Sequence, residues 1–206
     1  MIRNKKELDF YLKADAIMNG YTEEFNLVNC IHDFLSGGGR IKTFLRLMRK
    51  YDYYSNRKGL INYVKHAWYS MRFFRLGTKL GFSISPTSFG YGLVIPHNGT
   101  IVVGGKNKIG NYAVLHTSTC IASTDNIIGD GLYLATGGKI VKNVILGDNV
   151  SIAANSVVNK SAKNGNCLLV GSPAVSKMQS VPWWVRDGEK YKKRHDRIEE
   201  LKKIYF

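Results

Sequence analysis

The sequence has few cysteines, few prolines and no long hydrophobic run. Only 3 cysteines and 4 prolines occur among its 206 residues. The cysteines are scattered without a C-x-x-C pair, so a reduced cytoplasmic setting is expected and no metal site is predicted. No apolar run approaches the roughly 18 residues of a membrane-spanning helix, and no signal-peptide pattern is found. We therefore expect a protein that is neither exported nor membrane-spanning.

Acidic residues are also scarce, at 15 against 30 basic residues, which gives a formal net charge of +15. Most of the excess lies at the two ends: residues 1–80 hold 15 basic and 7 acidic side chains, and residues 177–206 hold 9 and 5. No RNA-binding aromatic signature or zinc pattern accompanies this charge, so no nucleic-acid partner is predicted. The excess positive charge is compatible with binding to an anionic cofactor, an anionic glycolipid or a membrane surface. Peripheral association of the basic ends with the inner face of the membrane is a further expectation.

The chain does contain a repeat of about six residues between residues 84 and 158. One aliphatic residue marks each unit, and a small residue such as Gly110 or Gly129 often follows it. The run is Ile95, Ile101, Ile109, Leu115, Ile121, Ile128, Leu134, Ile140, Leu146, Ile152 and Val158. A period of six fits neither an amphipathic helix nor an alternating strand. It predicts a triangular parallel β-helix in which three units form one rung of about eighteen residues.

The alternative fold is a β-sandwich with accidental spacing. Residue pairs typical of β-hairpin turns are scarce, however, and the one Asn-Gly pair, Asn98-Gly99, lies inside the repeat, where it is interpreted as a corner of the coil. We therefore assign residues 81–176 to the β-helix, residues 1–80 to a helical N-terminal region and residues 177–206 to a C-terminal helical extension.

The N-terminal region is predicted to be helical from its caps and apolar spacing. Asn4 followed by Glu7 indicates a helix start, and Gly37-Gly38-Gly39 ends a later helix. The apolar stripes are Phe25, Val28, Ile31 and Leu35 in one helix, Ile41, Leu45 and Met48 in the next, and Leu60, Val64, Trp68 and Met71 in the last. We expect these stripes to be buried against each other, the coil or a neighbouring subunit.

Beyond the repeat, a tryptophan pair precedes a charged helix that is predicted to begin near Asp187. Trp183 and Trp184 are interpreted first as a subunit contact or cap. A platform for the acceptor and an anchor at a membrane interface are the alternatives.

Three segments inside the repeat resemble the serine acetyltransferases of the hexapeptide-repeat acyltransferase superfamily. They are IPHNGTIVVG at residues 95–104, IAANSVV at residues 152–158 and VGSPA at residues 170–174. The resemblance covers residues 80–176. It implies a left-handed β-helix, acetyl-CoA as acyl donor, and a homotrimer with its sites between neighbouring coils.

His97 occupies the position of the general base in this resemblance. Acetyl transfer to a hydroxyl requires a group that removes the hydroxyl proton, and histidine, which ionises near neutral pH, suits that role. His116 falls about one rung later and is expected on the same face. It orients His97, binds the acceptor or has no role.

The sequence departs from the serine acetyltransferase pattern at three acceptor-side positions. Pro96 replaces an aspartate before the histidine, the segment FSISP at residues 82–86 replaces V-D-I-H-P, and residues 122–129 lack the family's Arg-His pair. The chain resembles more closely the short proteins encoded among capsule and surface-polysaccharide genes. We therefore predict O-acetylation of a sugar hydroxyl in a surface or capsular polysaccharide or its precursor. Serine O-acetylation and a non-catalytic basic binding module are the alternatives.

The resemblance also implies a set of coenzyme A contacts. Small residues would border the pantetheine arm and the adenine end, and cations would meet the phosphates. Ala122, Thr136 and Ala154 are predicted along the arm, Gly171 and Ser172 near the adenine, and Lys139 and Lys160 at the phosphates. Together they are expected to form a stripe along one edge of the coil.

Overall fold

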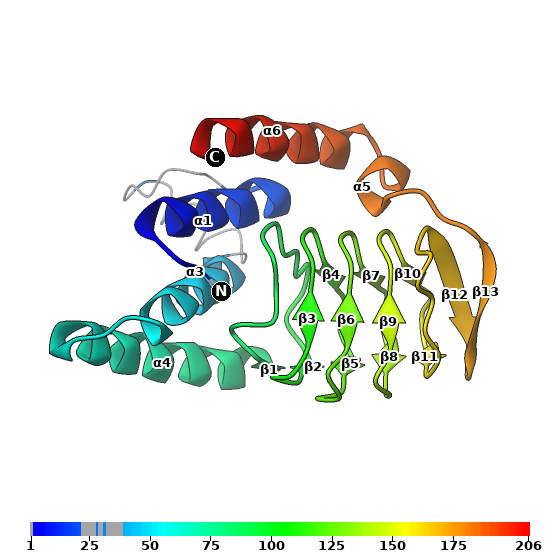
Figure 1. The fold of residues 1–206 in the computed structure, drawn as a ribbon, viewed down its shortest axis with the longest axis horizontal. Helices are drawn as coiled ribbons and strands as arrows, with labels where there is room; N and C mark the ends of the chain where they lie inside the picture. The colour runs from blue at the N-terminus through cyan, green and yellow to red at the C-terminus, as the bar shows by residue number, and fades with distance from the viewer. Residues whose placement is uncertain (1, 22–27, 29–30, 32–38) are drawn as a thin grey trace.

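The computed structural model describes residues 2–21, 28, 31 and 39–206. The helix predicted around Phe25 and Leu35 falls largely outside these residues, as does Cys30. The described chain forms three parts, which follow one another in Figure 1: N-terminal helices, a β-helical coil, and a C-terminal helix that returns along the coil. No described helix combines the length and apolar character needed to cross a bilayer.

The coil has three walls of short, stacked strands, here called sheets A, B and C. Sheet A contains β1 (Phe82–Ile84), β2 (Ile101–Val103), β5 (Thr119–Ile121), β8 (Lys139–Ile140) and β11 (Val157–Val158). Sheet B contains β3 (Lys108–Ile109), β6 (Ile127–Ile128) and β9 (Ile145–Leu146). Sheet C contains β4 (Val114–Leu115), β7 (Tyr133–Leu134), β10 (Ser151–Ile152), β12 (Cys167–Gly171) and β13 (Ala174–Gln179). This is the left-handed parallel β-helix predicted from the repeat, closed by the antiparallel pair β12 and β13.

The register confirms the predicted length of one rung. Ile101 pairs with Thr119 and Lys139 with Val157, eighteen residues apart in each case, and Val114 pairs with Tyr133, nineteen residues apart. Every aliphatic residue of the predicted run points into the core, with no more than 5% of its surface exposed. The repeat therefore predicted both the path of the chain and its core.

Small residues at the corners allow the rungs to stack closely. A Cβ atom on Gly129 would lie 2.2 Å from an Asp148 side-chain oxygen. That oxygen accepts a hydrogen bond of 2.8 Å from the backbone N–H of Asp130. Glycine at the corner thus leaves room for a carboxylate that binds the backbone of the rung beside it.

Three described helices form the N-terminal part: α1 (Lys5–Asn19), α3 (Gly39–Ser55) and α4 (Leu60–Leu80). Asn4 caps α1 by accepting a 2.8 Å hydrogen bond from the backbone N–H of Glu7, as predicted. The Glu7 carboxylate reaches back to the backbone of Arg3, one residue earlier than in a standard capping box.

A buried ion pair joins α1 and α3 to the coil. Arg49 on α3 lies 2.8 Å from the Asp15 carboxylate on α1 and donates to the carbonyl oxygens of Phe89 and Gly90. Asp15 also accepts from the backbone N–H of Leu93. One arginine and one aspartate therefore set the position of two helices on the start of the coil.

The predicted stripe of α3 is buried within the chain, whereas the predicted stripe of α4 is not covered by any described part of the same chain. Ile41, Leu45 and Met48 are buried on α3. On α4 the exposed fractions are 78% for Leu60, 57% for Val64, 45% for Trp68 and 50% for Met71. Helical spacing identified the apolar face, but α3 packs against the opposite side of α4, through residues such as Phe73.

Two C-terminal helices, α5 (Trp183–Arg186) and α6 (Glu189–Tyr205), follow the coil. Trp183 is 2% exposed and donates from its indole nitrogen to the Tyr112 carbonyl oxygen at 2.8 Å. Trp184 stacks on His195 of α6, with ring centroids 4.5 Å apart. Both tryptophans are thus buried within the chain, which corrects their interpretation as a subunit contact or acceptor platform. They anchor α6, which in Figure 1 runs alongside α1.

Candidate functional site

The two candidate catalytic histidines lie at the edge of the coil where the chain passes from sheet C to sheet A. His116 directly follows β4, and its backbone N–H donates to the Leu134 carbonyl oxygen of the next rung. His97 occupies the corresponding turn one rung earlier, between Val94, which pairs with Val114, and β2. The structure therefore brings His97 and His116 to the same edge, as the sequence predicts.

The environments of the two histidines differ. His97 is exposed, whereas His116 is half-buried. A hydrogen bond of 2.9 Å joins the Nε2 atom of His116 to the hydroxyl of Tyr133, which is on the next strand of sheet C. Burial lowers the pKa of His116, and a positive charge on His97 lowers it further, so His116 favours its neutral form.

The C-terminal part of the chain reaches the same place. The Arg186 guanidinium lies 4.3 Å from the centre of the Tyr133 ring and donates a 3.0 Å hydrogen bond to the Ser151 hydroxyl. Arg186 also pairs with Asp187 at 2.7 Å. Their charges act on His116 in opposite directions: Asp187 raises its pKa and Arg186 lowers it.

Sequence reasoning missed Tyr133, Arg186 and Asp187. Tyr133 starts the strand stacked next to β4 and pairs with Val114, two residues before His116, so stacking of the rungs would have brought it near His116. Nothing in the repeat indicates that α5 returns to this edge, because the return depends on the burial of Trp183 and Trp184.

The predicted coenzyme A residues divide between two edges of the coil. Thr136, Ala154, Gly171 and Ser172 share the edge of the histidines, where the Asn155 backbone N–H donates to the Thr136 carbonyl oxygen. Lys139 lies on sheet A, and its ammonium group donates to the Gly137 carbonyl oxygen at 3.0 Å.

Ala122 and Lys160 lie at the opposite edge of sheet A, where the chain leaves for sheet B. The predicted single stripe is therefore wrong for these two residues. Residues share an edge when their separation is close to a multiple of one rung of about eighteen residues, and Ala122 and Thr136 are separated by fourteen.

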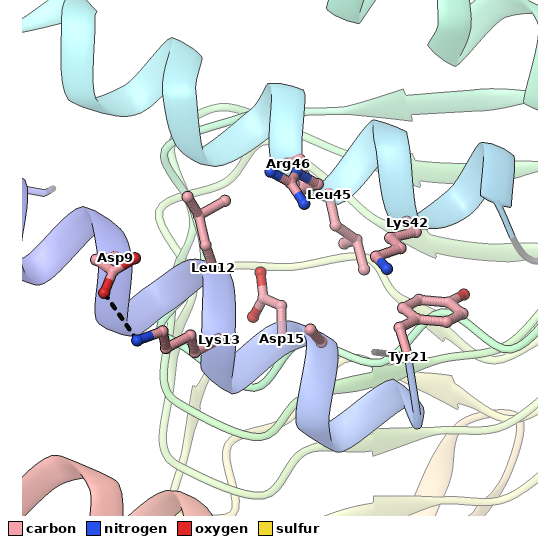
Figure 2. A pocket seen from close by; sticks show the side chains of 9 residues that line it. Asp9, Leu12, Lys13, Asp15, Tyr21, Lys42, Leu45 and Arg46 are labelled. Atoms are coloured by element: carbon pink, nitrogen blue, oxygen red, sulfur yellow. Dashed lines mark ion pairs between the residues drawn. The ribbon is translucent and has the colours of Figure 1, made fainter. Parts of the chain in front are cut away.

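A separate cavity of about 200 Å³ lies between α1 and α3, away from the histidines. Figure 2 shows side chains from both helices directed at it. Its lining includes Asp9, Leu12, Lys13, Asp15, Lys42 and Leu45. It contains none of the predicted site residues. Within the described part of the chain, no group of three His, Cys, Asp or Glu side chains is placed to hold a metal ion.

Comparison with known proteins gives a consistent family of relatives. The serine acetyltransferase of Buchnera aphidicola is 26% identical over 195 residues, which cover 85% of this chain and 68% of that protein. The serine acetyltransferase of Staphylococcus aureus strain Mu50 is 30% identical over 123 residues, which cover 56% of each chain. The chain thus spans little more than half the length of the second relative. No family model matches the chain.

Solved structures of low sequence identity share the fold. Serine acetyltransferase from Brucella abortus strain S19 matches with a TM-score of 0.63 at 20% identity, covering 86% of this chain and 72% of that one. The enzyme from Neisseria gonorrhoeae matches with a TM-score of 0.57 at 23% identity, covering 84% and 66%. The Brucella enzyme has also been solved in complex with coenzyme A.

The fold and these relatives support a relationship to the hexapeptide-repeat acyltransferase superfamily. They indicate an acyltransferase that takes its acetyl group from acetyl-CoA, and they favour this function over the non-catalytic binding module.

Every relative and structure named above is a serine acetyltransferase, so the prediction of a polysaccharide acceptor is overturned. That prediction rested on three missing acceptor-side features, one of them the aspartate replaced by Pro96, and on the resemblance to short proteins encoded among capsule and surface-polysaccharide genes. Missing residues show what a site lacks and leave open which other side chains take over their contacts.

Proposed function

We propose that this protein transfers the acetyl group of acetyl-CoA to the hydroxyl of L-serine. Two histidines on one exposed edge, one exposed and one held neutral, carry this proposal. The serine acetyltransferase relatives support the choice of acceptor.

In this reaction His97 is the general base. As its imidazole removes the proton of the serine hydroxyl, the oxygen attacks the thioester carbonyl carbon and a tetrahedral intermediate forms. When the intermediate collapses, the carbon–sulfur bond breaks and the sulfur of coenzyme A takes the proton back from His97. The products are O-acetylserine and free coenzyme A, and His97 returns to its starting state.

His116 and Tyr133 support this step without exchanging the transferred proton. Because its pKa is lowered, His116 adds no second positive charge when His97 becomes protonated. Its hydrogen bond to Tyr133 fixes the plane of the ring. We propose that His116 orients the acceptor hydroxyl toward His97.

The acceptor carries both a carboxylate and an ammonium group, and the site edge offers a partner for each. Arg186 is a bidentate donor suited to a carboxylate, and Asp187 suits an ammonium group. We propose that this pair replaces the acceptor contacts missing at Pro96 and at residues 82–86. Arg186→Gln should then raise the KM for L-serine by about tenfold or more and leave the KM for acetyl-CoA nearly unchanged. Equal changes in both constants would exclude this role.

On the donor side, we propose that acetyl-CoA lies along sheet A between two subunits of a homotrimer. The C-to-A edge of one coil, with Thr136, Ala154, Gly171 and Ser172, would face the A-to-B edge of its neighbour, with Ala122 and Lys160. Lys139 would lie on the wall between them. The cytoplasm is the expected location, because acetyl-CoA is made and used there.

Release of free thiol from acetyl-CoA tests the proposal. L-serine should give steady release, while D-serine, L-threonine, monosaccharides and oligosaccharides should give little more than the rate without acceptor. A second measurement, mass spectrometry of the product, should show one acetyl group on the serine oxygen. A clear preference for any sugar over L-serine would refute the serine proposal and leave the acyltransferase fold intact.

A further inference from the structure

Helix α4 presents an apolar face that the described chain does not cover. Five large apolar side chains recur on it at intervals of three, four and seven residues, and each is at least 45% exposed. They are Leu60, Val64, Trp68, Met71 and Phe74, called here the α4 strip. In Figure 1, α3 lies on one side of α4 and no described element lies beyond the other. A continuous exposed strip of this kind indicates a binding surface.

Positive charge borders the α4 strip. Residues 39–80 contain eleven Lys and Arg side chains and one acidic residue, the buried Asp52. Arg72, Arg75 and Lys79 lie in the last turns of α4, and none of the three forms an ion pair with any carboxylate of the described chain. The concentration of charge is high enough that Arg46 and Arg72 add to the effect of burial in lowering the pKa of Lys50.

The three basic residues also line a cleft. Its volume is about 310 Å³, and it lies between α3 and α4 with Thr43, Leu47 and Leu76 as the other lining residues. Trp68 stands at the border between the apolar and basic surfaces, with the Arg72 guanidinium 4.6 Å from the centre of its ring. A tryptophan between apolar and charged groups is typical of the interface between water and lipid.

We propose that the α4 strip docks on the surface of an anionic phospholipid bilayer, with Arg72, Arg75 and Lys79 binding headgroup phosphates. The helix would lie in the plane of the interface, its apolar side chains among the first acyl carbons. A second α4 strip fits less well, because residues 39–80 hold eleven Lys and Arg side chains against one buried acidic residue, and pairing two strips would bring like charges together. A nucleic acid would use the cations and leave the apolar side chains exposed to water.

Docking would place the candidate site close to the bilayer. The backbone N–H of Gly99, two residues after His97, donates a 2.9 Å hydrogen bond to the carbonyl oxygen of Leu80 at the end of α4. The proposal depends on α4 alone and is independent of the acceptor.

Sedimentation of the full chain with lipid vesicles tests this inference. Vesicles of phosphatidylcholine with about one third phosphatidylglycerol should bind the protein at least tenfold more tightly than pure phosphatidylcholine vesicles. The double change Arg72→Gln and Arg75→Gln should weaken binding to anionic vesicles about tenfold to thirtyfold. Trp68→Ser with Met71→Ser should weaken binding to a similar extent, through lost apolar contact.

Matched controls lie on the opposite part of the molecule. Lys190→Gln with Lys193→Gln removes two exposed charges from α6, and Ile204→Ser removes an exposed apolar side chain. Both should bind vesicles within about twofold of the unchanged protein.

Three results would overturn the proposal. The first is equal binding of the α4 variants and the controls. The second is a change in the molecular mass of the Trp68→Ser and Met71→Ser protein without lipid, which would make the strip a subunit interface. The third is salt-sensitive binding of duplex DNA together with no binding to anionic vesicles.

Discussion

At the scale of single residues, the chemistry depends on a difference between two similar side chains. His97 is exposed at the edge of the coil, and His116 is half-buried one rung further on with a hydrogen bond to Tyr133. Exposure gives His97 access to a substrate proton. Burial gives His116 a fixed position and a preference for the neutral form, so the same residue type serves two purposes.

Substitution of the two histidines should therefore have unequal effects. His97→Ala should lower kcat by about 10²–10⁴-fold while leaving acetyl-CoA affinity nearly unchanged, because the base is lost and the donor contacts remain. His116→Ala should lower kcat by about tenfold to a hundredfold, since only orientation is lost. Steady-state kinetics with both substrates measures this. If the His97→Ala protein were active and the His116→Ala protein inactive, His116 would be the general base and His97 the orienting residue.

The lowered pKa of His116 also predicts how stability responds to acid. The unfolded side chain takes up a proton as the pH falls through its ordinary value near 6.5, and the folded side chain does so only at lower pH. Protons therefore favour the unfolded state, and stability is lost as the pH falls below that value. In His116→Asn the fall in Tm between about pH 7.5 and about pH 5.5 should be smaller than in the unchanged protein. An equal or larger fall would show that His116 is not held neutral.

At the scale of elements, the N-terminal helices are held on the coil by polar groups as well as by packing. Arg49 and Asp15 are both buried, and between them they bind three backbone groups of residues 89–93. Removal of one partner leaves the other charge buried and unpaired, which costs more than loss of the pair itself.

Arg49→Met alone should accordingly lower the free energy of unfolding by about 3–5 kcal/mol. The double change Arg49→Met with Asp15→Leu should cost less than the single change, because no uncompensated charge remains. Urea unfolding followed by circular dichroism gives both values. If the double variant were less stable than Arg49→Met, the hydrogen bond from the Leu93 backbone N–H to Asp15 would contribute more to stability than relief of the unpaired buried charge.

The elements also show how far sequence reasoning reaches. The coil was predictable because every sixth residue fills a narrow core, so the pattern reports local geometry directly, as Ile128 and Leu134 show. What covers the apolar face of α4 could not be predicted, because helical spacing identifies such a face and says nothing about which element packs against it. Ala122 was placed on the wrong edge because position on a triangular coil depends on the count within a rung of eighteen. The contribution of Arg186 depends on how α5 packs, which no local pattern encodes.

At the scale of the whole molecule, the distribution of candidate donor residues over two edges of sheet A bears on assembly. One coenzyme A cannot follow both edges of a single coil, but the C-to-A edge of one coil and the A-to-B edge of another can border the same cleft. A homotrimer contains three such clefts, because cyclic symmetry repeats the contact between the C-to-A edge of one coil and the A-to-B edge of its neighbour. In solution it should have a mass of about 70 kDa, three times the 23.2 kDa of the chain.

Mixed trimers would test the shared cleft directly. His97→Ala removes the base from one edge, and Lys160→Glu places a negative charge near the proposed phosphate position on the other. If neighbouring subunits supply the two residues, some clefts of a mixed trimer combine an intact His97 with an intact Lys160. Random assembly from equal amounts should restore about a quarter of the activity lost in the separate variants. Co-refolding the two proteins and assaying thiol release measures this recovery. If both residues came from one coil, mixing would restore none, and a monomer on light scattering would exclude the trimer and the shared cleft together.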